Sequence, residues 1–364
     1  MSKVRIGIIG CGGMARSHAS RFEDVLDKIE VTAVVDIEHE KAQAVADLLG
    51  GDVLIETDYR AIYDHVDAVL IVVPHHLHHP VSMDCLKAGK HVLVEKPMAL
   101  DEAECVEMIA EAEKQDRVLM VAYCMRFHPL VVKMKELLDQ KTYGDVFQLS
   151  IWTEQLTQRD DGHWSRSAAT LGGGQFFSHG CHYVDLLLWM LGRPVRGNHY
   201  GTNRCTPWME KEGTSNVTIE FEGGVLGYHF GTWGARGTRL KYSFHAHCEN
   251  GMLEIDLRAG QLIAHTRAEE HDSGKLVAHQ KEEVLMEIEH TKNTELEMAH
   301  FIDCIQTGRQ PLTDGAGSLE GLQIIWKLYE AEENNAVADL GNLGLGSWQG
   351  NAPRSSCPPT EATA

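Results

Sequence analysis

The sequence predicts an α/β fold: an N-terminal doubly wound parallel sheet of the Rossmann type, then a C-terminal α/β domain with a large, open, mostly antiparallel sheet. Two changes of pattern lead to this prediction. Short apolar runs alternate with helical segments as far as Tyr123, and longer strands of alternating polarity follow Pro129. A chain of 364 residues also exceeds one ordinary core, so two domains are expected.

Strand-like runs in the first part of the chain are bounded by Gly, Asp, Lys or Pro. They occupy residues 4–10, 31–36, 68–73, 91–97 and 118–123. Continuous apolar strands that alternate with helices are typical of a parallel sheet buried on both faces. We therefore expect the first domain to cover residues 1–125.

A second domain is expected over residues 126–345. Its strand-like runs are longer and alternate apolar with polar residues, at 146–152, 216–221, 225–233, 240–248 and 251–257. Alternation indicates an antiparallel sheet with helices on one face and the other face free to pack against a partner. Residues 294–336 return to helical periodicity, interrupted at 307–311, and residues 346–364 are expected to form a mobile tail.

The composition excludes several classes of function. The formal charge of −20 disfavours nucleic acid and anionic membranes as partners, so a small-molecule substrate is expected. No apolar run reaches 18 residues and no export signal precedes the first strand. The nine cysteines form no CxxC pair, which indicates neither a disulfide framework nor a zinc site and favours the cytoplasm.

A glycine-rich turn directly follows the first strand. Gly10, Cys11, Gly12, Gly13 and Met14 lie in a G-x-G-x-x-A pattern, which ends the strand and begins a helix. Such a turn brings backbone amides close to a pyrophosphate at a helix N-terminus. The next strand ends at Asp36, whose carboxylate can accept hydrogen bonds from both ribose hydroxyls and would repel a 2′-phosphate. We therefore predict NAD, rather than NADP, as the cofactor.

Two further strand ends are expected to line the same cleft. Pro74 and His75 begin a histidine-rich loop after the strand at 68–73, and adjacent side chains there diverge too much to indicate a metal site, so no metal is expected. Glu95 and Lys96 end the strand at 91–94 and precede Pro97. At this edge the ammonium of Lys96 could polarise a substrate hydroxyl or stabilise an oxyanion.

The segment 172–192 carries the information about substrate chemistry. Read as a helix, it places Ser178, His182 and Asp185 at i, i+4 and i+7 on one face, with His179 about 100° away. The apolar run 186–190 would bury this helix.

Together, GIIGCGGMA, PHHLHH, EKP, YCMRFHP and GGGQFFSHGCHYVDLLLWMLG resemble the glucose-fructose oxidoreductase / inositol dehydrogenase / rhizopine catabolism (Gfo/Idh/MocA) family. The resemblance covers nearly the whole chain. It implies NAD(P)-dependent chemistry on sugars or cyclitols and a homo-oligomer, a dimer or tetramer. Lys96 matches the catalytic lysine and His182 the proton-exchanging histidine, while His78 and Glu95 match cofactor contacts. Ser178 departs from the pattern, because the family has an aspartate there.

Three functions remain open at this point. The first is a dehydrogenase that moves a hydride between a ring hydroxyl and NAD, with His182 as base, Lys96 as electrophile and Asp185 helping to orient His182. The second is an NAD-dependent glycosidase that oxidises its substrate transiently, eliminates the aglycone, adds water and returns the hydride, with Ser178 and His179 as additional groups. The third is a non-catalytic sensor of NAD or sugar. Residues expected to contact the substrate are Tyr123, Arg126, Trp164, Arg166 and Asp185.

Overall fold

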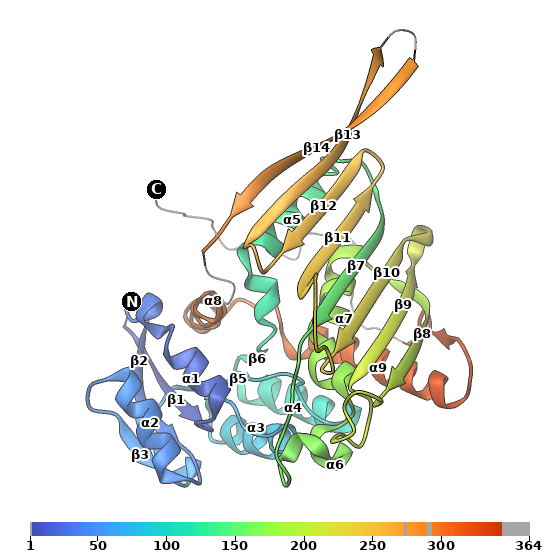
Figure 1. The fold of residues 1–364 in the computed structure, drawn as a ribbon. Coiled ribbons are helices and arrows are strands. Elements are labelled where there is room, and N and C mark those ends of the chain that lie inside the picture. The colour runs from blue at the N-terminus through green and yellow to red at the C-terminus, as the bar shows by residue number, and fades with distance from the viewer. Residues whose placement is uncertain (1, 273–274, 290–292, 344–364) are drawn as a thin grey trace.

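The N-terminal part of the chain forms a parallel sheet of six strands in the order β3-β2-β1-β4-β5-β6 (Figure 1). The computed structural model describes residues 2–272, 275–289 and 293–343, so the tail expected at 346–364 lies outside the described residues. The strands are β1 (Val4–Ile9), β2 (Ile29–Val35), β3 (Leu54–Glu56), β4 (Ala68–Ile71), β5 (His91–Val94) and β6 (Leu119–Val121). The Rossmann prediction is confirmed, and the strand order reverses between β1 and β4, where ligands bind in such sheets.

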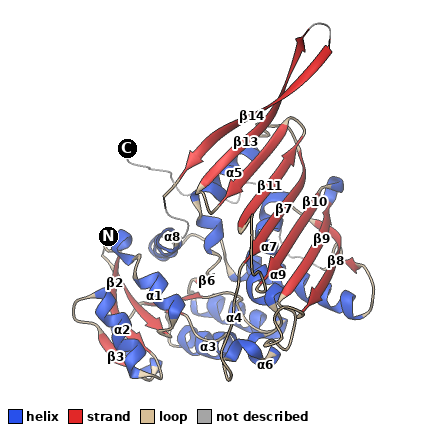
Figure 2. Ribbon diagram, viewed as in Figure 1, coloured by secondary structure: helices blue, strands red, loops and turns tan. Residues whose placement is uncertain are grey.

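Helices cover both faces of this parallel sheet (Figure 2). They are α1 (Gly13–Ala19), α2 (His39–Leu49), α3 (His78–Lys87) and α4 (Glu102–Gln115). All four residues of β4 are fully buried, as a strand covered on both faces requires. The helix α4 begins where Asp101 accepts a hydrogen bond from the backbone N–H of Glu104, and it ends at Asp116 in the left-handed conformation.

The second sheet has nine strands in the order β14-β13-β12-β11-β7-β10-β9-β8-β15, and only β7 and β10 pair in parallel. Its strands are β7 (Val146–Glu154), β8 (Pro194–Thr202), β9 (Thr214–Phe221), β10 (Leu226–Thr232), β11 (Tyr242–Cys248), β12 (Gly251–Asp256), β13 (Gln261–Asp272), β14 (Lys275–Glu287) and β15 (Ala338–Asp339). The prediction of a mostly antiparallel sheet is confirmed. The sequence analysis missed β3 in the first sheet and β8 and β15 in the second. It also missed the hairpin of β13 and β14, which projects beyond the rest of the sheet (Figure 1).

One face of the second sheet packs on helices. They are α5 (Pro129–Asp139), α7 (Cys181–Leu191) and α9 (Gly315–Glu333). Strand residues that alternate along β7 and β11, such as Leu149 and Phe244, are fully buried in the core beneath these helices. On the other face the rings of Trp152, Tyr228 and Phe230 lie together and remain partly exposed.

The helix α8 (Thr294–Thr307) packs on the first sheet, although it follows the second sheet in the chain. Its buried residues Met298, Phe301 and Ile302 share a core cluster with β1. The chain therefore returns to the N-terminal part after it has formed the large sheet. The domain boundary expected after residue 125 stays a prediction. In the described part of the chain, no helix has the length and apolar character needed to cross a bilayer.

Candidate active site

A cavity of about 1240 Å³ lies between the two sheets, at the carboxyl ends of the parallel strands. Residues of both sheets line it, so residues that are far apart in the sequence lie close together in the fold. Of the predicted site residues, those that line the cavity are Gly10, Gly12, Gly13, Met14, Asp36, Pro74, His75, His78, Glu95, Lys96, Trp164, Ser178, His179 and His182.

The glycine turn after β1 leaves room for a ligand. Gly10 has φ +91°, and a Cβ there would lie 2.3 Å from the Val72 carbonyl oxygen, so only glycine fits. A Cβ at Gly12 or Gly13 would meet no atom within 4 Å, because both face the cavity. This open space at the N-terminus of α1 fits the pyrophosphate of a dinucleotide.

Asp36 lies at the end of β2 with both carboxylate oxygens held by backbone amides. Oδ2 accepts from the N–H of Cys11 at 2.8 Å, and Oδ1 accepts from the N–H of Glu38 at 2.9 Å. Cys11 itself does not line the cavity, because its side chain is fully buried. Its contribution to the site is the backbone amide that orients Asp36.

Glu95 forms a buried pair with His18, a residue of α1 that the sequence analysis missed. Glu95 Oε1 lies 2.9 Å from His18 Nε2. Burial, the largest single influence, acts to raise the pKa of the Glu95 carboxyl, but the hydrogen bond with His18 and the electrostatic effects of His18, Lys96 and His78 together lower this pKa. The pair connects α1 to the end of the strand that carries Lys96. The sequence could have indicated this pair only through a histidine at a buried position of the Rossmann helix.

Lys96 reaches across to the second part of the chain. Its Nζ donates to the backbone carbonyl oxygen of Ser178 at 3.0 Å. Among the hydrogen bonds of the described residues, none involves the Ser178 hydroxyl. The carbonyl can hold the ammonium in place, but it lacks the charge of a carboxylate.

The predicted helix at 172–192 begins as a π-helix. Phe176–Gly180 form the π-turn, and α7 continues from Cys181. The extra residue of a π-turn widens the helix at Ser178 and His179 and changes the faces expected from regular α-helical spacing. Such turns are frequent at functional sites.

Buried Glu212 and partly buried Tyr329, both distant in sequence, hold the glycine run that begins this segment. Glu212 Oε1 accepts from the backbone N–H of Phe176 at 3.1 Å and from the Tyr329 hydroxyl at 2.7 Å. The same hydroxyl accepts from the N–H groups of Gly174 and Phe177. A Cβ at Gly174 would lie 2.2 Å from the Glu212 carboxylate, so glycine is required for this close approach.

His182 lies in the cavity wall with little water around it. Burial lowers the pKa of its imidazole well below 6.5, and the nearby Lys96 and His179 lower it further. The ring is therefore neutral near pH 7. The ring of Tyr123 meets it edge-on at 5.6 Å, but Tyr123 does not line the cavity.

His179 belongs to a polar group at the edge of the second sheet. Its Nε2 lies 3.4 Å from the Tyr242 hydroxyl, and its Nδ1 lies 3.4 Å from Gln175 Nε2. The Tyr242 hydroxyl also donates to Gln155 Oε1 at 2.5 Å. The sequence analysis missed Gln155 and Tyr242, because alternating strand residues give no sign of which strand end meets a helix.

The histidine-rich loop joins the two parts of the cavity. His75 Nδ1 lies 2.9 Å from the Leu171 carbonyl oxygen, and its ring meets Trp164 edge-on at 4.7 Å. His78 lies between the carbonyl oxygens of Pro97 and Val73, and burial lowers its pKa. Both rings are held by backbone oxygens, and no metal-binding group of His, Cys, Asp or Glu is found among the described residues.

Besides Tyr123, three more residues expected to contact the substrate lie outside the cavity wall. Arg126 and Asp185 form a buried bidentate pair at 2.7 and 2.6 Å, so each charge is satisfied by the other. Asp185 consequently does not orient His182. Arg166 pairs with Asp161 at 2.8 Å and is not among the residues that line the cavity.

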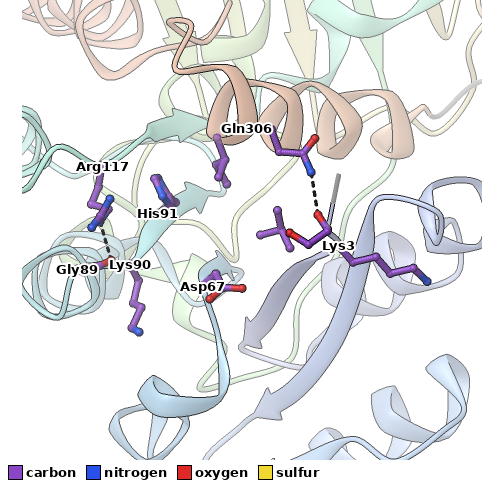
Figure 3. Close-up of a pocket in the computed structure, with 10 residues that line it drawn as sticks. Lys3, Asp67, Gly89, Lys90, His91, Arg117 and Gln306 are labelled. Carbon is purple, nitrogen blue, oxygen red and sulfur yellow. Dashed lines mark hydrogen bonds between the residues drawn. The ribbon is translucent and has the colours of Figure 1, made fainter.

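A second cavity of about 490 Å³ lies at the opposite edge of the parallel sheet, where its strands begin (Figure 3). Lys3, Asp67, Lys90 and Arg117 are among its lining residues. Lys3 extends away from the other labelled side chains, and Arg117 bonds to the Gly89 carbonyl oxygen. None of the predicted site residues lies there.

Comparison with known families identifies both parts of the chain. Residues 4–123 match a model described as the oxidoreductase family with an NAD-binding Rossmann fold, GFO_IDH_MocA. Residues 131–254 match the GFO/IDH/MocA C-terminal domain.

Individual proteins show the same similarity. Inositol 2-dehydrogenase 1 of Saccharopolyspora erythraea is 35% identical over 145 residues, which cover 39% of this chain and 43% of that protein. Myo-inositol 2-dehydrogenase of Thermotoga maritima is 29% identical over 229 residues, 62% of this chain and 67% of that protein. The chain thus matches less than half of the first relative's length. The crystal structure of aldose-aldose oxidoreductase from Caulobacter crescentus, complexed with glycerol, superposes with a TM-score of 0.79 at 25% identity, covering 93% of this chain and all of that one.

Proposed function

Because the chain belongs to the Gfo/Idh/MocA oxidoreductase family, we propose that it transfers a hydride between a ring carbon of a sugar or cyclitol and NAD. The observation that carries this proposal is the meeting of Lys96 and His182 in one cavity with the glycine turn and Asp36. The nicotinamide would supply the hydride acceptor. The residues of the chain then need to bind the cofactor, orient the hydroxyl and move one proton.

The cofactor half of the cavity supports NAD over NADP. The amides of Cys11 and Glu38 fix the Asp36 carboxylate at the end of β2, where it would accept from ribose hydroxyls. A 2′-phosphate would meet this negative charge. Glu95, paired with His18, would stand on the nicotinamide side beside Lys96.

In the proposed mechanism, His182 removes the proton from the substrate hydroxyl. Its lowered pKa keeps the imidazole neutral and able to accept a proton. The ammonium of Lys96, held by the Ser178 carbonyl, stabilises the developing oxyanion. His179 stands beside this base, with its ring 6.1 Å from that of His182.

The neighbouring histidines also favour one second candidate, the redox-neutral glycosidase. Elimination and rehydration need an acid or base besides the one that serves hydride transfer, and His179 could supply it. The non-catalytic sensor has no comparable support, because Lys96 and His182 both line the cavity.

The test incubates the purified protein with NAD or NADP and with free sugars, inositols or aryl glycosides, and it follows cofactor reduction and aglycone release. Net reduction by a free sugar supports the dehydrogenase. Aglycone release without net reduction favours the glycosidase, and cofactor binding without either activity favours the sensor. Lys96→Ala should lower turnover at least about a hundredfold while NAD still binds. Lys90→Ala, outside this cavity, is the control.

A further inference from the structure

The substrate side of the cavity is positively charged, although the chain as a whole carries a net charge of −20. From Ala122 onward, the described residues that line the cavity include no Asp or Glu. The basic residues among them are Arg159, Lys241 and Arg258, which we call the basic rim. The lining carboxylates, among them Asp36 and Glu95, all belong to the cofactor side.

Strand register brings the basic rim together at one edge of the second sheet. Tyr242, next to Lys241, pairs with Thr153 of β7, and Ser243 pairs with Asp256 of β12. Arg159 follows the end of β7 and Arg258 follows the end of β12, so the three cations leave adjacent strands at the same edge. The Tyr242 hydroxyl, 3.4 Å from His179 Nε2, joins this edge to the π-turn.

Nearby carboxylates neutralise the basic rim only in part. In the part of the chain that the structure describes, Arg159 and Lys241 have no carboxylate ion pair, and Arg258 meets Asp256 only at 3.8 Å. Glu154 instead accepts from the backbone N–H of Lys241. Two of the three cations therefore lack an ion pair and the pair of the third is long, so the rim retains positive charge that can act on a ligand that enters the cavity.

The serine at position 178, where the resemblance implies an aspartate, also favours an anionic ligand. A carboxylate at this position would stand in the wall beside Lys96 and His182, and it would repel an anion. Ser178 is neutral, and the Lys96 ammonium rests on a backbone carbonyl. Consequently, position 178 adds no negative charge that would reduce the positive potential on the substrate side.

We propose that the substrate is an anionic carbohydrate, a sugar or cyclitol that carries a carboxylate or phosphate, which the basic rim binds while a ring hydroxyl faces Lys96 and His182. This inference rests on the proposed oxidoreductase function and deepens it. An acid group reaching the rim would gain charge-assisted hydrogen bonds that a neutral sugar cannot make. It would also be drawn toward the cavity mouth by the local field, despite the negative charge of the protein.

The experiment compares glucose, glucuronate and glucose 6-phosphate, and likewise myo-inositol and an inositol monophosphate, with the NAD-loaded protein. We expect kcat/KM for one acidic member of a set to exceed that of its neutral member by about tenfold or more. Whether the carboxylate or the phosphate is preferred identifies the anion. Raising the salt concentration should raise KM for the acid and leave kcat unchanged, because exposed charges are screened.

The variant Arg159→Gln/Lys241→Gln/Arg258→Gln should abolish this preference, so that kcat/KM for the acidic member falls to that of its neutral counterpart. Its matched control removes three exposed cations outside the cavity, with Lys28→Gln, Lys87→Gln and Arg193→Gln, and should behave like the parent protein. Equal kcat/KM for neutral and acidic members, or a preference that survives the rim variant, overturns the inference and leaves the oxidoreductase proposal intact.

Absence of turnover with every sugar contradicts the proposed function instead, and calorimetry then decides the charge inference separately. Tighter binding of an acidic member than of its neutral counterpart, lost in the rim variant, supports it. Equal binding, or binding of neither, overturns it.

Discussion

The Nζ of Lys96 donates to the backbone carbonyl of Ser178 at 3.0 Å, so the lysine is held by the main chain of the π-turn and not by the side chain at position 178. A main-chain acceptor is independent of the residue type that supplies it. Compared with the aspartate that the family resemblance implies at this position, serine lacks a charge, while the point of attachment stays in place.

Ser178→Ala should consequently keep kcat within about threefold of the parent, because the lost hydroxyl takes part in no hydrogen bond among the described residues. Steady-state kinetics, with a substrate identified in the turnover test described above, would measure this. A loss of a hundredfold would mean that the hydroxyl itself takes part in the reaction. Melting temperature serves as the control for folding.

The pH dependence of kcat/KM should report the depressed pKa of His182. Burial, Lys96 and His179 disfavour the imidazolium, so the neutral base persists below pH 6.5 and the acid limb of hydroxyl oxidation lies well below that pH. Ser178→Asp would stabilise the imidazolium and move this limb to higher pH. If the acid limb of the parent protein lies near pH 6.5 and does not move in Ser178→Asp, this result contradicts the assignment of His182 as base.

Asp36→Ala should raise KM for NAD about tenfold to a hundredfold, since hydrogen bonds to a charged acceptor contribute about 1.5–3 kcal/mol. The same change should improve the use of NADP. Because Asp36 also accepts from Cys11 and Glu38, Asp36→Asn serves as the variant that keeps the shape of the side chain. Unchanged NAD kinetics in both variants would place the adenosine ribose elsewhere.

Glu297 of α8 is fully buried, and neither of its carboxyl oxygens has a hydrogen-bond partner among the residues that the structure describes. Burial, and then the nearby Glu95, raise its pKa well above 4.5. A raised carboxyl pKa contributes stability that is present below pH 4.5 and is lost as the pH rises toward the folded-state value. The loss amounts to up to about 1.4 kcal/mol per pH unit in that window.

Glu297→Gln should therefore be more stable than the parent at pH 8 and about equally stable at pH 4.5, as measured by urea unfolding at both values. The exposed Glu40→Gln on α2 is the matched control, with no pH-dependent difference expected. A variant less stable than the parent at pH 8 would show that the Glu297 carboxylate is ionised and paired in the folded protein.

The sequence predicted what depends on local pattern. Apolar runs bounded by turn residues located the parallel strands, and the glycine spacing and Asp36 located one half of the cavity, because each signal lies within a few residues. The hairpin of β13 and β14 was missed, since its charged residues hide the alternation.

Long-range pairing explains the remaining errors. Arg126 and Asp185 were each plausible substrate contacts until the fold placed them against each other. Glu212 and Tyr329 carried no local signal, because they act on a glycine run far away in the chain. A residue's polarity shows that it needs a partner, but only the tertiary structure identifies that partner.

The π-turn at Phe176–Gly180 makes the reacting geometry depend on residue count as well as residue type. Deleting one residue would restore a continuous α-helix and rotate one flank by about 100° relative to the other. The helix would still bury its apolar side, but the carbonyl that holds Lys96 and the imidazole of His182 would no longer face the same volume. Length variation in this short stretch is thus a route by which a chain of this fold could lose its chemistry while retaining its stability.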